Sequence, residues 1–396
     1  MTAPPSALRA GHAWIPFAEC RLTPGARSRV LTTMASGELG PGPQAEAFEA
    51  ALREQTGKRH AILTSSGSAA LELALRVLDL PPASTVLLPT FSFVSAAHTV
   101  VRCGLRPVLV DADERTLTVG PEEVADAARR ERPAAMIVDH TAGFPAATQT
   151  LADAANLPLS RIVEKGAQVI GIRPGPAPVA AVGAMNCHSF HSASILPIGS
   201  GGAITTADPE LADRLRIMRQ QGMSVDAWRR SQRGASWRYD ITELGMGAGC
   251  TDLQAAIGLG QLTHVPVWQA RRAELAARYH RNLSTIAAIT PPSWPTSGTH
   301  SWNFYIVKVQ PTFGMSRDVL ATRLTERAVG TSVQHTPVHH FTYFHWLLGD
   351  DVGRLPVADR LADQVLSLPL HPHLSDDDVD YVCTQLAEFA QGCAAQ

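Results

Sequence analysis

Small hydroxyl residues gather at residues 64–68, where an apolar run ends and a helical pattern over residues 69–77 begins. The N-terminus of a helix offers free N–H groups and the positive end of the helix dipole, and both attract anions such as phosphate. Simple capping of the helix by Ser66 or Ser68 explains the same residues. The segment taken alone therefore leaves two interpretations open, an anion site and a helix cap.

Lysine is scarce in this chain, since only Lys58, Lys165 and Lys308 occur among the 34 lysines and arginines. A lysine amine can attack a carbonyl carbon and can move protons, whereas the guanidinium of arginine stays protonated. Any chemistry that needs a reactive amine is therefore confined to very few positions.

Histidine is the other residue type that suits acid–base chemistry near neutral pH. We interpret His188 and His191 as packing residues, whereas His335, His339 and His340 share one segment near the C-terminus. No HxH or HxxxH spacing on a predicted helix indicates a metal site, and we expect none.

Short apolar runs alternate with longer helical patterns between residues 45 and 260. The expected strands are residues 85–89, 107–111, 134–140, 161–164, 185–190 and 203–206. Several are apolar on both faces, which is typical of strands buried between helix layers. The alternation predicts an α/β domain with a mostly parallel sheet, in which ligands bind at the carboxyl ends of the strands.

The pattern changes after residue 261. A helical stretch leads to an extended segment at residues 302–309, then to a loop at residues 336–340 and a last helix from residue 376. We therefore predict a large α/β domain over residues 1–260, including the N-terminal segment, and a small α+β domain over residues 261–396.

Composition excludes several classes of protein. The formal net charge of −2 gives no broad basic surface for nucleic acid or for an anionic membrane. No apolar run reaches the length of about 18 residues that a membrane-spanning helix needs. The six cysteines are scattered without a CxxC pair, which favours a reduced, cytoplasmic protein.

Several segments, in this order along nearly the whole chain, resemble the motifs of the DegT-type nucleotide-sugar aminotransferases. That family has the fold-type-I architecture and uses pyridoxal 5′-phosphate (PLP). The matching segments are residues 36–42 with 48–49, 66–71, 88–93, 164–168, 189–191 with 199–202, 252–262 and 366–370. The resemblance implies a large domain with a mostly parallel sheet between helices and a smaller C-terminal α+β domain.

The resemblance also assigns a cofactor cradle. Gly67 and Ser68 stand in the family's phosphate loop, and Phe93 stands where an aromatic ring stacks on the pyridine. Gln168 and Ser189 keep the family's residue types at two strand ends. We expect these five residues to hold the cofactor or, in its place, a substrate or another anion.

The chain departs from the family at the residues that carry the chemistry. Ser194 occupies the place of the lysine that forms the imine, and Lys165 occupies the place of the carboxylate that keeps the pyridine nitrogen protonated. An ammonium there opposes protonation of the ring. Gly247 replaces an asparagine that reaches the cofactor phosphate of the neighbouring subunit.

These departures lead us to expect an enzyme that works without transamination on a nucleotide-sugar or a similar polar metabolite of a biosynthetic pathway. Lys165, His339 and Ser194 are its candidate catalytic residues, and dehydration, isomerisation and group transfer all suit them. We expect no cofactor, or PLP or the amine form PMP bound without a covalent link.

Two alternatives stay open. The chain can be a non-catalytic partner subunit of an active aminotransferase or of another pathway enzyme, or it can use PLP or PMP through a non-standard site such as an imine at Lys165. Either way, the resemblance implies a dimer, formed with a second copy or with a related chain.

Overall fold

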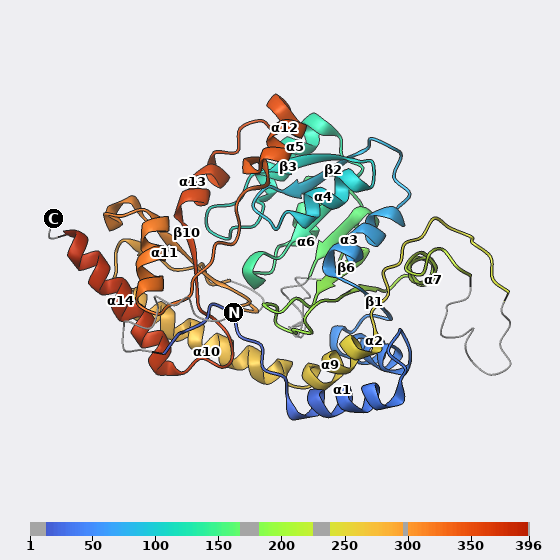
Figure 1. Cartoon of the computed structure of the whole chain (residues 1–396). Coiled ribbons are helices and arrows are strands. Elements are labelled where there is room, and N and C mark those ends of the chain that lie inside the picture. The colour runs from blue at the N-terminus through green and yellow to red at the C-terminus, as the bar shows by residue number, and fades with distance from the viewer. Residues whose placement is uncertain (1–12, 167–181, 225–237, 296–299, 395–396) are drawn as a thin grey trace.

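The computed structural model describes residues 13–166, 182–224, 238–295 and 300–394 (Figure 1). Within these residues, a seven-stranded sheet has the strand order β1-β7-β6-β5-β4-β2-β3. The strands are β1 (His60–Thr64), β2 (Thr85–Pro89), β3 (Arg106–Val110), β4 (Ala135–Asp139), β5 (Ile162–Lys165), β6 (Met185–Ser189) and β7 (Gly202–Thr206). Only β7 runs antiparallel to its neighbours, so the predicted mostly parallel sheet is confirmed.

The six predicted strands appear within one residue of their expected ends. Strands β2 and β4 are buried along their whole length, because helices cover both faces of the sheet. Strand β1 is not among the predicted strands, because the sequence indicates only an apolar run before residue 64.

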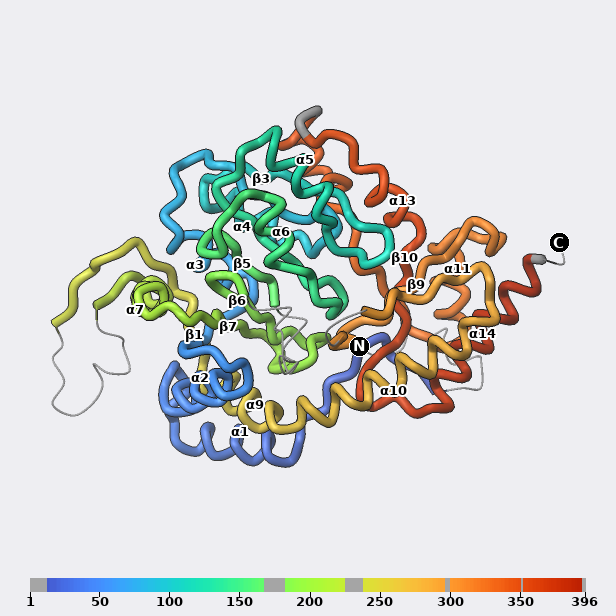
Figure 2. Tube along the Cα trace, turned by 180° about the vertical axis from the view of Figure 1, so that it is seen from behind, coloured from blue at the N-terminus to red at the C-terminus, as the bar shows by residue number. Residues whose placement is uncertain are grey.

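Helices form layers around this sheet (Figures 1 and 2). Helices α3, α4 and α7 contribute to one core, α5 and α6 to another, and α2 with α9 to a third. The helices are α1 (Pro24–Ser36), α2 (Pro43–Thr56), α3 (Gly67–Arg76), α4 (Ser95–Arg102), α5 (Pro121–Glu131), α6 (Thr148–Ala154), α7 (Pro209–Met218), α9 (Asp252–Leu262), α10 (Val265–Leu283), α11 (Arg317–Glu326), α12 (Thr342–Leu348), α13 (Pro356–Gln364) and α14 (Asp376–Ala394). No helix among the described residues is long and apolar enough to cross a membrane.

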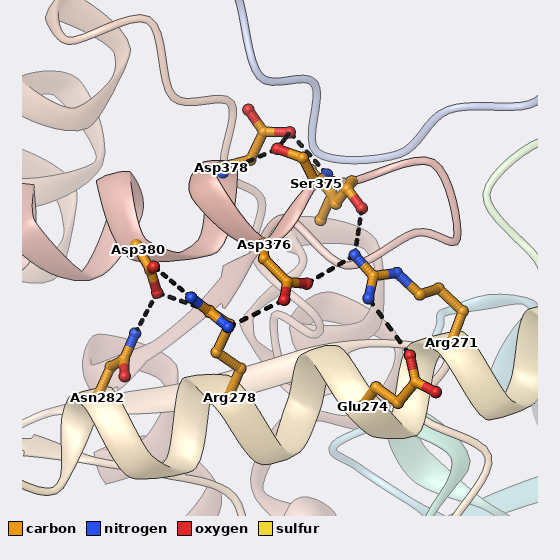
Figure 3. Close-up of polar contacts among 9 residues, drawn as sticks. Arg271, Glu274, Arg278, Asn282, Ser375, Asp376, Asp378 and Asp380 are labelled. Carbon is orange, nitrogen blue, oxygen red and sulfur yellow. Dashed lines mark hydrogen bonds and ion pairs between the residues drawn. The ribbon is translucent and has the colours of Figure 1, made fainter.

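A second, three-stranded antiparallel sheet has the order β10-β9-β8, with β8 (Ile289–Thr290), β9 (Tyr305–Val309) and β10 (Val365–Leu368). Helices α10 and α14 pack side by side against it. Figure 3 shows that Arg271 and Arg278 of α10 reach Asp376 and Asp380 at the start of α14. Asp376, in the first turn, also suits the positive end of the α14 dipole.

The chain crosses between the two sheets more than once. Ile15 packs in the core of the small sheet, and Phe344 and Ala358 pack in the core of the large one. The boundary at residue 260 therefore stays a prediction about the main division of the chain.

Candidate functional site

A cavity of about 440 Å³ lies beside the carboxyl-terminal edge of the large sheet. Strands β4, β5 and β6 are parallel there, so their last residues Asp139, Lys165 and Ser189 end at the same edge. Asp139 and Lys165 are direct partners in the strand register. Lys165 and Ser189 line the cavity, which is the position that parallel-sheet topology predicts for a ligand.

The loop that leads into α3 forms one end of this cavity. Ser66 is the N-cap, and its Oγ accepts the N–H of Ala69 at 3.1 Å. The first-turn N–H groups of Gly67 and Ser68 have no hydrogen-bond partner elsewhere in the described parts of the chain. The predicted helix cap is therefore present, and it leaves two donors for an anion.

Glycine is required at this loop because a side chain would not fit. A Cβ atom on Gly67 would lie 2.6 Å from Cβ of Ser189, and one on Gly202 would lie 2.5 Å from the backbone of Ser66. The close approach of the loop to β6 and β7 brings Ser68 and Ser189 to the same end of the cavity.

Phe93 follows β2 and lines the cavity with a ring that is 54% exposed. Its ring centre lies 6.1 Å from that of His335, which also lines the cavity. An exposed aromatic face in a cavity is suited to stacking on a flat ligand.

Lys165 enters the cavity wall as half of a buried ion pair. Its Nζ donates to Asp139 Oδ2 at 2.7 Å and to Ser92 Oγ at 3.0 Å. Ser92 in turn donates to the same carboxylate oxygen at 2.5 Å. The side chains of Lys165 and Asp139 are only 9% and 0% exposed, so the three groups form a closed hydrogen-bonded cluster.

Burial alone would raise the pKa of Asp139. The Lys165 ammonium and the hydrogen bonds from Lys165 and Ser92 outweigh that effect and hold the pKa of Asp139 below its ordinary value. The carboxylate is thus ionised at neutral pH and neutralises the charge of Lys165. Of the three N–H bonds of the ammonium, two are used within this cluster.

Ser194 also lines the cavity, but its hydroxyl is directed at the backbone. Its Oγ lies 2.7 Å from the carbonyl oxygen of His191 and 3.1 Å from that of Leu196. A serine hydroxyl carries a single hydrogen, and here that hydrogen is donated to a backbone carbonyl within the turn.

Three residues that line the cavity carry buried polar atoms without partners. Asn303 Oδ1, Gln334 Oε1 and His335 Nε2 are buried and form no hydrogen bond within the described residues, and all three residues line the cavity. Buried polar atoms are nearly always hydrogen-bonded in folded proteins. The presence of three polar side chains in the cavity lining favours a polar ligand.

His335 is held in the neutral form. Burial lowers its pKa most, and the nearby Lys165 ammonium lowers it further, to about 3. His335 therefore offers a hydrogen bond at neutral pH rather than a charge.

One predicted site residue, His339, is not brought to this cavity, and another cannot be placed. Gln168 lies outside the described residues. His339 does not line the cavity, because its Nδ1 contacts Thr90 Oγ1 at 2.7 Å and its Nε2 contacts Asp359 Oδ1 at 2.8 Å. His340 Nε2 lies 2.8 Å from the same Asp359 oxygen.

Sequence reasoning missed Asp139, Ser92, Asn303, Gln334 and His335. One signal was available for Asp139, because a carboxylate ends an otherwise apolar strand next to the strand that ends in a lysine. The wall formed by Asn303 and Gln334 comes from the small-sheet part of the chain, and no local pattern connects those residues to the large sheet.

Comparisons with known proteins agree with this geometry. The model of the DegT/DnrJ/EryC1/StrS aminotransferase family matches residues 23–387. The spore coat polysaccharide biosynthesis protein SpsC of Bacillus subtilis (strain 168) is 33% identical over 365 residues, which are 92% of this chain and 94% of SpsC.

Solved structures are similar over almost the whole chain. The aminotransferase TlmJ of Streptoalloteichus hindustanus has 31% identity and a TM-score of 0.84, with 97% of this chain and all (100%) of TlmJ covered. Spr1654 of Streptococcus pneumoniae, a presumed sugar aminotransferase solved in its PMP form, has 25% identity and a TM-score of 0.86, with 96% and 100% covered. The predicted fold-type-I architecture is confirmed.

The same comparisons contradict the expectation of a protein without a cofactor. The matched family is one of aminotransferases, and Spr1654 was solved with PMP. They point to a PLP-type cofactor rather than to none. The expectation is wrong because it rests on the missing lysine and gives less weight to residues 66–71, which resemble the family's phosphate loop.

The two ends of the site fit such a cofactor differently. The donors of Gly67 and Ser68 and the exposed face of Phe93 fit its phosphate and its ring. The end where the family has its lysine does not fit, because Ser194 has no amine and its hydroxyl is engaged by backbone carbonyls. The ammonium of Lys165, paired with Asp139, does not fit the place of the carboxylate.

Proposed function

This chain belongs to the DegT/DnrJ/EryC1/StrS aminotransferase family, and we propose that it binds a nucleotide-sugar and acts on it without lysine-dependent transamination. The observation that carries the proposal is the state of two side chains. Ser194 offers no amine, and the ammonium of Lys165 is bound to Asp139 and Ser92. Neither position supplies the free amine that transamination requires.

The polarity of the cavity supports a sugar-containing ligand. Asn303, Gln334 and His335 line the cavity with side chains that can exchange hydrogen bonds with sugar hydroxyl groups. The N–H groups of Gly67 and Ser68 supply donors for a phosphate. The B. subtilis relative, whose name assigns it to polysaccharide biosynthesis, is consistent with a sugar pathway.

The Lys165 cluster is the proposed acid–base group. The third N–H of the ammonium has no partner in the described parts of the chain, and Lys165 lines the cavity. That N–H can donate to a carbonyl or hydroxyl oxygen of the sugar, while Asp139 balances the charge. Such a donor suits proton-transfer reactions, among them isomerisation and dehydration.

Calorimetric titration with UDP-glucose and dTDP-glucose tests the binding half of the proposal, and inorganic phosphate and PLP serve as separate arms. We expect at least one nucleotide-sugar to bind more tightly than phosphate. Gln334→Ala should weaken that binding about tenfold, because it removes a hydrogen-bonding group from the cavity wall.

Gln149→Ala on the exposed face of α6 is the matched control and should leave the affinity unchanged. The proposal is wrong if neither nucleotide-sugar binds at millimolar concentration. Repeating the titration in the presence of PLP shows whether nucleotide-sugar and cofactor occupy the cavity together or exclude each other.

We also propose that the chain forms a homodimer. Large apolar side chains are exposed on α1, where Leu31 and Met34 are 67% and 59% exposed, and in the segment that holds Ile241 and Leu244, at 56% and 80%. A subunit interface over these two segments would remove their apolar side chains from water. Light scattering that finds only monomer at micromolar concentration would contradict the proposal.

A further inference from the structure

A second group of chemically active side chains lies outside the cavity. His339 and His340 stand on the short 3₁₀ turn Val338–His340, and Asp359 stands in the first turn of α13. The nitrogen and oxygen atoms that they offer all lie within 4.8 Å of one another. Successive residues of a chain seldom direct their side chains at one atom, yet both Nε2 atoms lie 2.8 Å from Asp359 Oδ1.

We propose that His339, His340 and Asp359 form a binding site for a divalent transition-metal ion of the zinc type. Two imidazoles and a carboxylate are a common protein ligand set for zinc, with a solvent molecule in the remaining position. The site is separate from the cavity of the proposed function and does not depend on it.

The distances between the ligand atoms suit this assignment. Zinc binds nitrogen and oxygen at about 2.0–2.2 Å, so neighbouring ligands of a tetrahedral ion lie roughly 3.3–3.5 Å apart. The two separations from Asp359 Oδ1, both 2.8 Å, need an opening of only about half an ångström. Since the Asp359 and His340 side chains are 54% and 37% exposed, rotation of these two side chains can provide that opening.

The most buried ligand is oriented by a residue of the large sheet. The His339 side chain is 12% exposed, and its Nδ1 contacts Oγ1 of Thr90 at 2.7 Å. Thr90 follows β2 directly, and backbone hydrogen bonds to Val110 and Val338 fix it in place. A hydrogen-bond partner on the other ring nitrogen is typical of metal-binding histidines, because it sets the ring orientation and the tautomer.

The position of the site suggests a structural role for the ion. It would join the turn Val338–His340 to α13, and the chain just before this turn carries Gln334 and His335 into the cavity wall. An ion at this point would restrict the movement of that wall.

The test is a titration of the full-length protein with Zn²⁺ by calorimetry and with Co²⁺ by visible absorption. A Cys20→Ser background removes the exposed thiol as a competing ligand. We expect one ion per chain, and a Co²⁺ spectrum of the four- or five-coordinate kind. His340→Ala should weaken the binding of Zn²⁺ at least tenfold.

Two further variants make the test specific. Thr90→Val should lower the affinity for Zn²⁺ by about 10- to 100-fold, because it leaves the ligands in place and removes only the orienting hydroxyl. His345→Ala removes an exposed histidine of the neighbouring helix α12 and should leave the affinity unchanged. Circular dichroism checks that each variant is folded.

The proposal is overturned if the wild-type chain takes up no ion. It is equally overturned if His340→Ala, once shown to be folded, binds Zn²⁺ with the stoichiometry and affinity of the wild type. A loss of binding in His345→Ala as large as in His340→Ala would also contradict it.

Discussion

Charged side chains are paired in two contrasting regions of this molecule. At the edge of the large sheet, Lys165 and Asp139 are 9% and 0% exposed and bind each other at 2.7 Å. Between α10 and α14, Arg271 and Arg278 contact Asp376 at 2.8 and 2.9 Å, and the Asp376 side chain is 50% exposed (Figure 3). The ion-pair distances in the two regions are similar, but one pair is buried and the other pairs are exposed to water.

The difference lies in what remains when one partner is lost. Water solvates each exposed charge by itself, so the loss of one partner of such a pair costs little. A buried charge that loses its partner has no such replacement, and the loss is strongly destabilising. The lysine at position 165 is therefore tied to the carboxylate at position 139, and a change at one of them requires a change at the other.

The largest expected effect is on the buried pair. Lys165→Met should lower the free energy of unfolding by about 3–5 kcal/mol, because it leaves Asp139 buried without a counter-charge. Urea denaturation at pH 7, followed by circular dichroism, measures this loss.

The double variant Lys165→Met/Asp139→Leu is the control for that prediction. It removes both charges and should recover most of the lost stability, since apolar replacements of buried ion pairs are often neutral. If the single and double variants are equally unstable, the two side chains do not depend on each other.

A second effect should appear gradually as the pH falls. Burial first and Lys165 second lower the pKa of His335 from 6.5 to about 3. Above pH 6.5 the folded and unfolded states both hold it neutral; below that value only the unfolded state takes up the proton. Stability is therefore lost as the pH falls from 6.5 towards 3, by about 1.4 kcal/mol per pH unit for this group.

Replacement of His335 separates its contribution to the pH dependence of stability from the contributions of the other histidines. His335→Gln should flatten the pH dependence of the unfolding free energy between pH 6 and 4 by roughly one proton. Above pH 7.5 the curves of variant and wild type should run parallel. Equal slopes in the acid range would show that the burial of His335 does not control its titration.

The smallest effect is expected in the exposed network. Asp376→Asn should shift the melting temperature by less than about 2 °C, because water replaces the lost contacts of Arg271 and Arg278. Differential scanning calorimetry at low and high salt measures this shift, which should shrink further in salt. If Asp376→Asn lowers the melting temperature as much as Lys165→Met does, the buried and the exposed pairs do not differ in the way described.

Much of the fold could be predicted from the sequence. Strands such as β2 and β4 are continuous apolar runs, and burial on both faces leaves little alternative for them. Ser66, Gly67 and Ser68 stand at the start of a predicted helix, and in the structure these residues line the cavity.

The rest of the site could not be predicted in this way. Asp139, the partner of Lys165, lies on another strand. The two residues meet because of the register between β4 and β5, which cannot be read from the sequence. His339 was expected near the substrate, yet Thr90 and Asp359 hold it outside the cavity. Contacts between distant segments decide both outcomes, and these contacts are not encoded in local spacing.

The buried pair also changes how activity should be restored. Ser194→Lys supplies an amine, but Lys165 still opposes protonation of a pyridine nitrogen. Adding Lys165→Asp alone would set a second carboxylate against Asp139, its register partner. We therefore expect the triple variant Ser194→Lys/Lys165→Asp/Asp139→Ala to transaminate faster than the single or the double variant, as measured by 2-oxoglutarate formed from L-glutamate. A single variant that matches the triple would contradict the role given to Lys165.

The most direct test of the central claim is the same half-reaction in the unmodified protein. Purified protein supplied with PLP is mixed with L-glutamate, and the 2-oxoglutarate formed is counted against the number of chains. The account predicts no more product than free PLP gives without protein, because neither Ser194 nor Lys165 offers a free amine. One equivalent of 2-oxoglutarate per chain, formed faster than with free PLP, would contradict it.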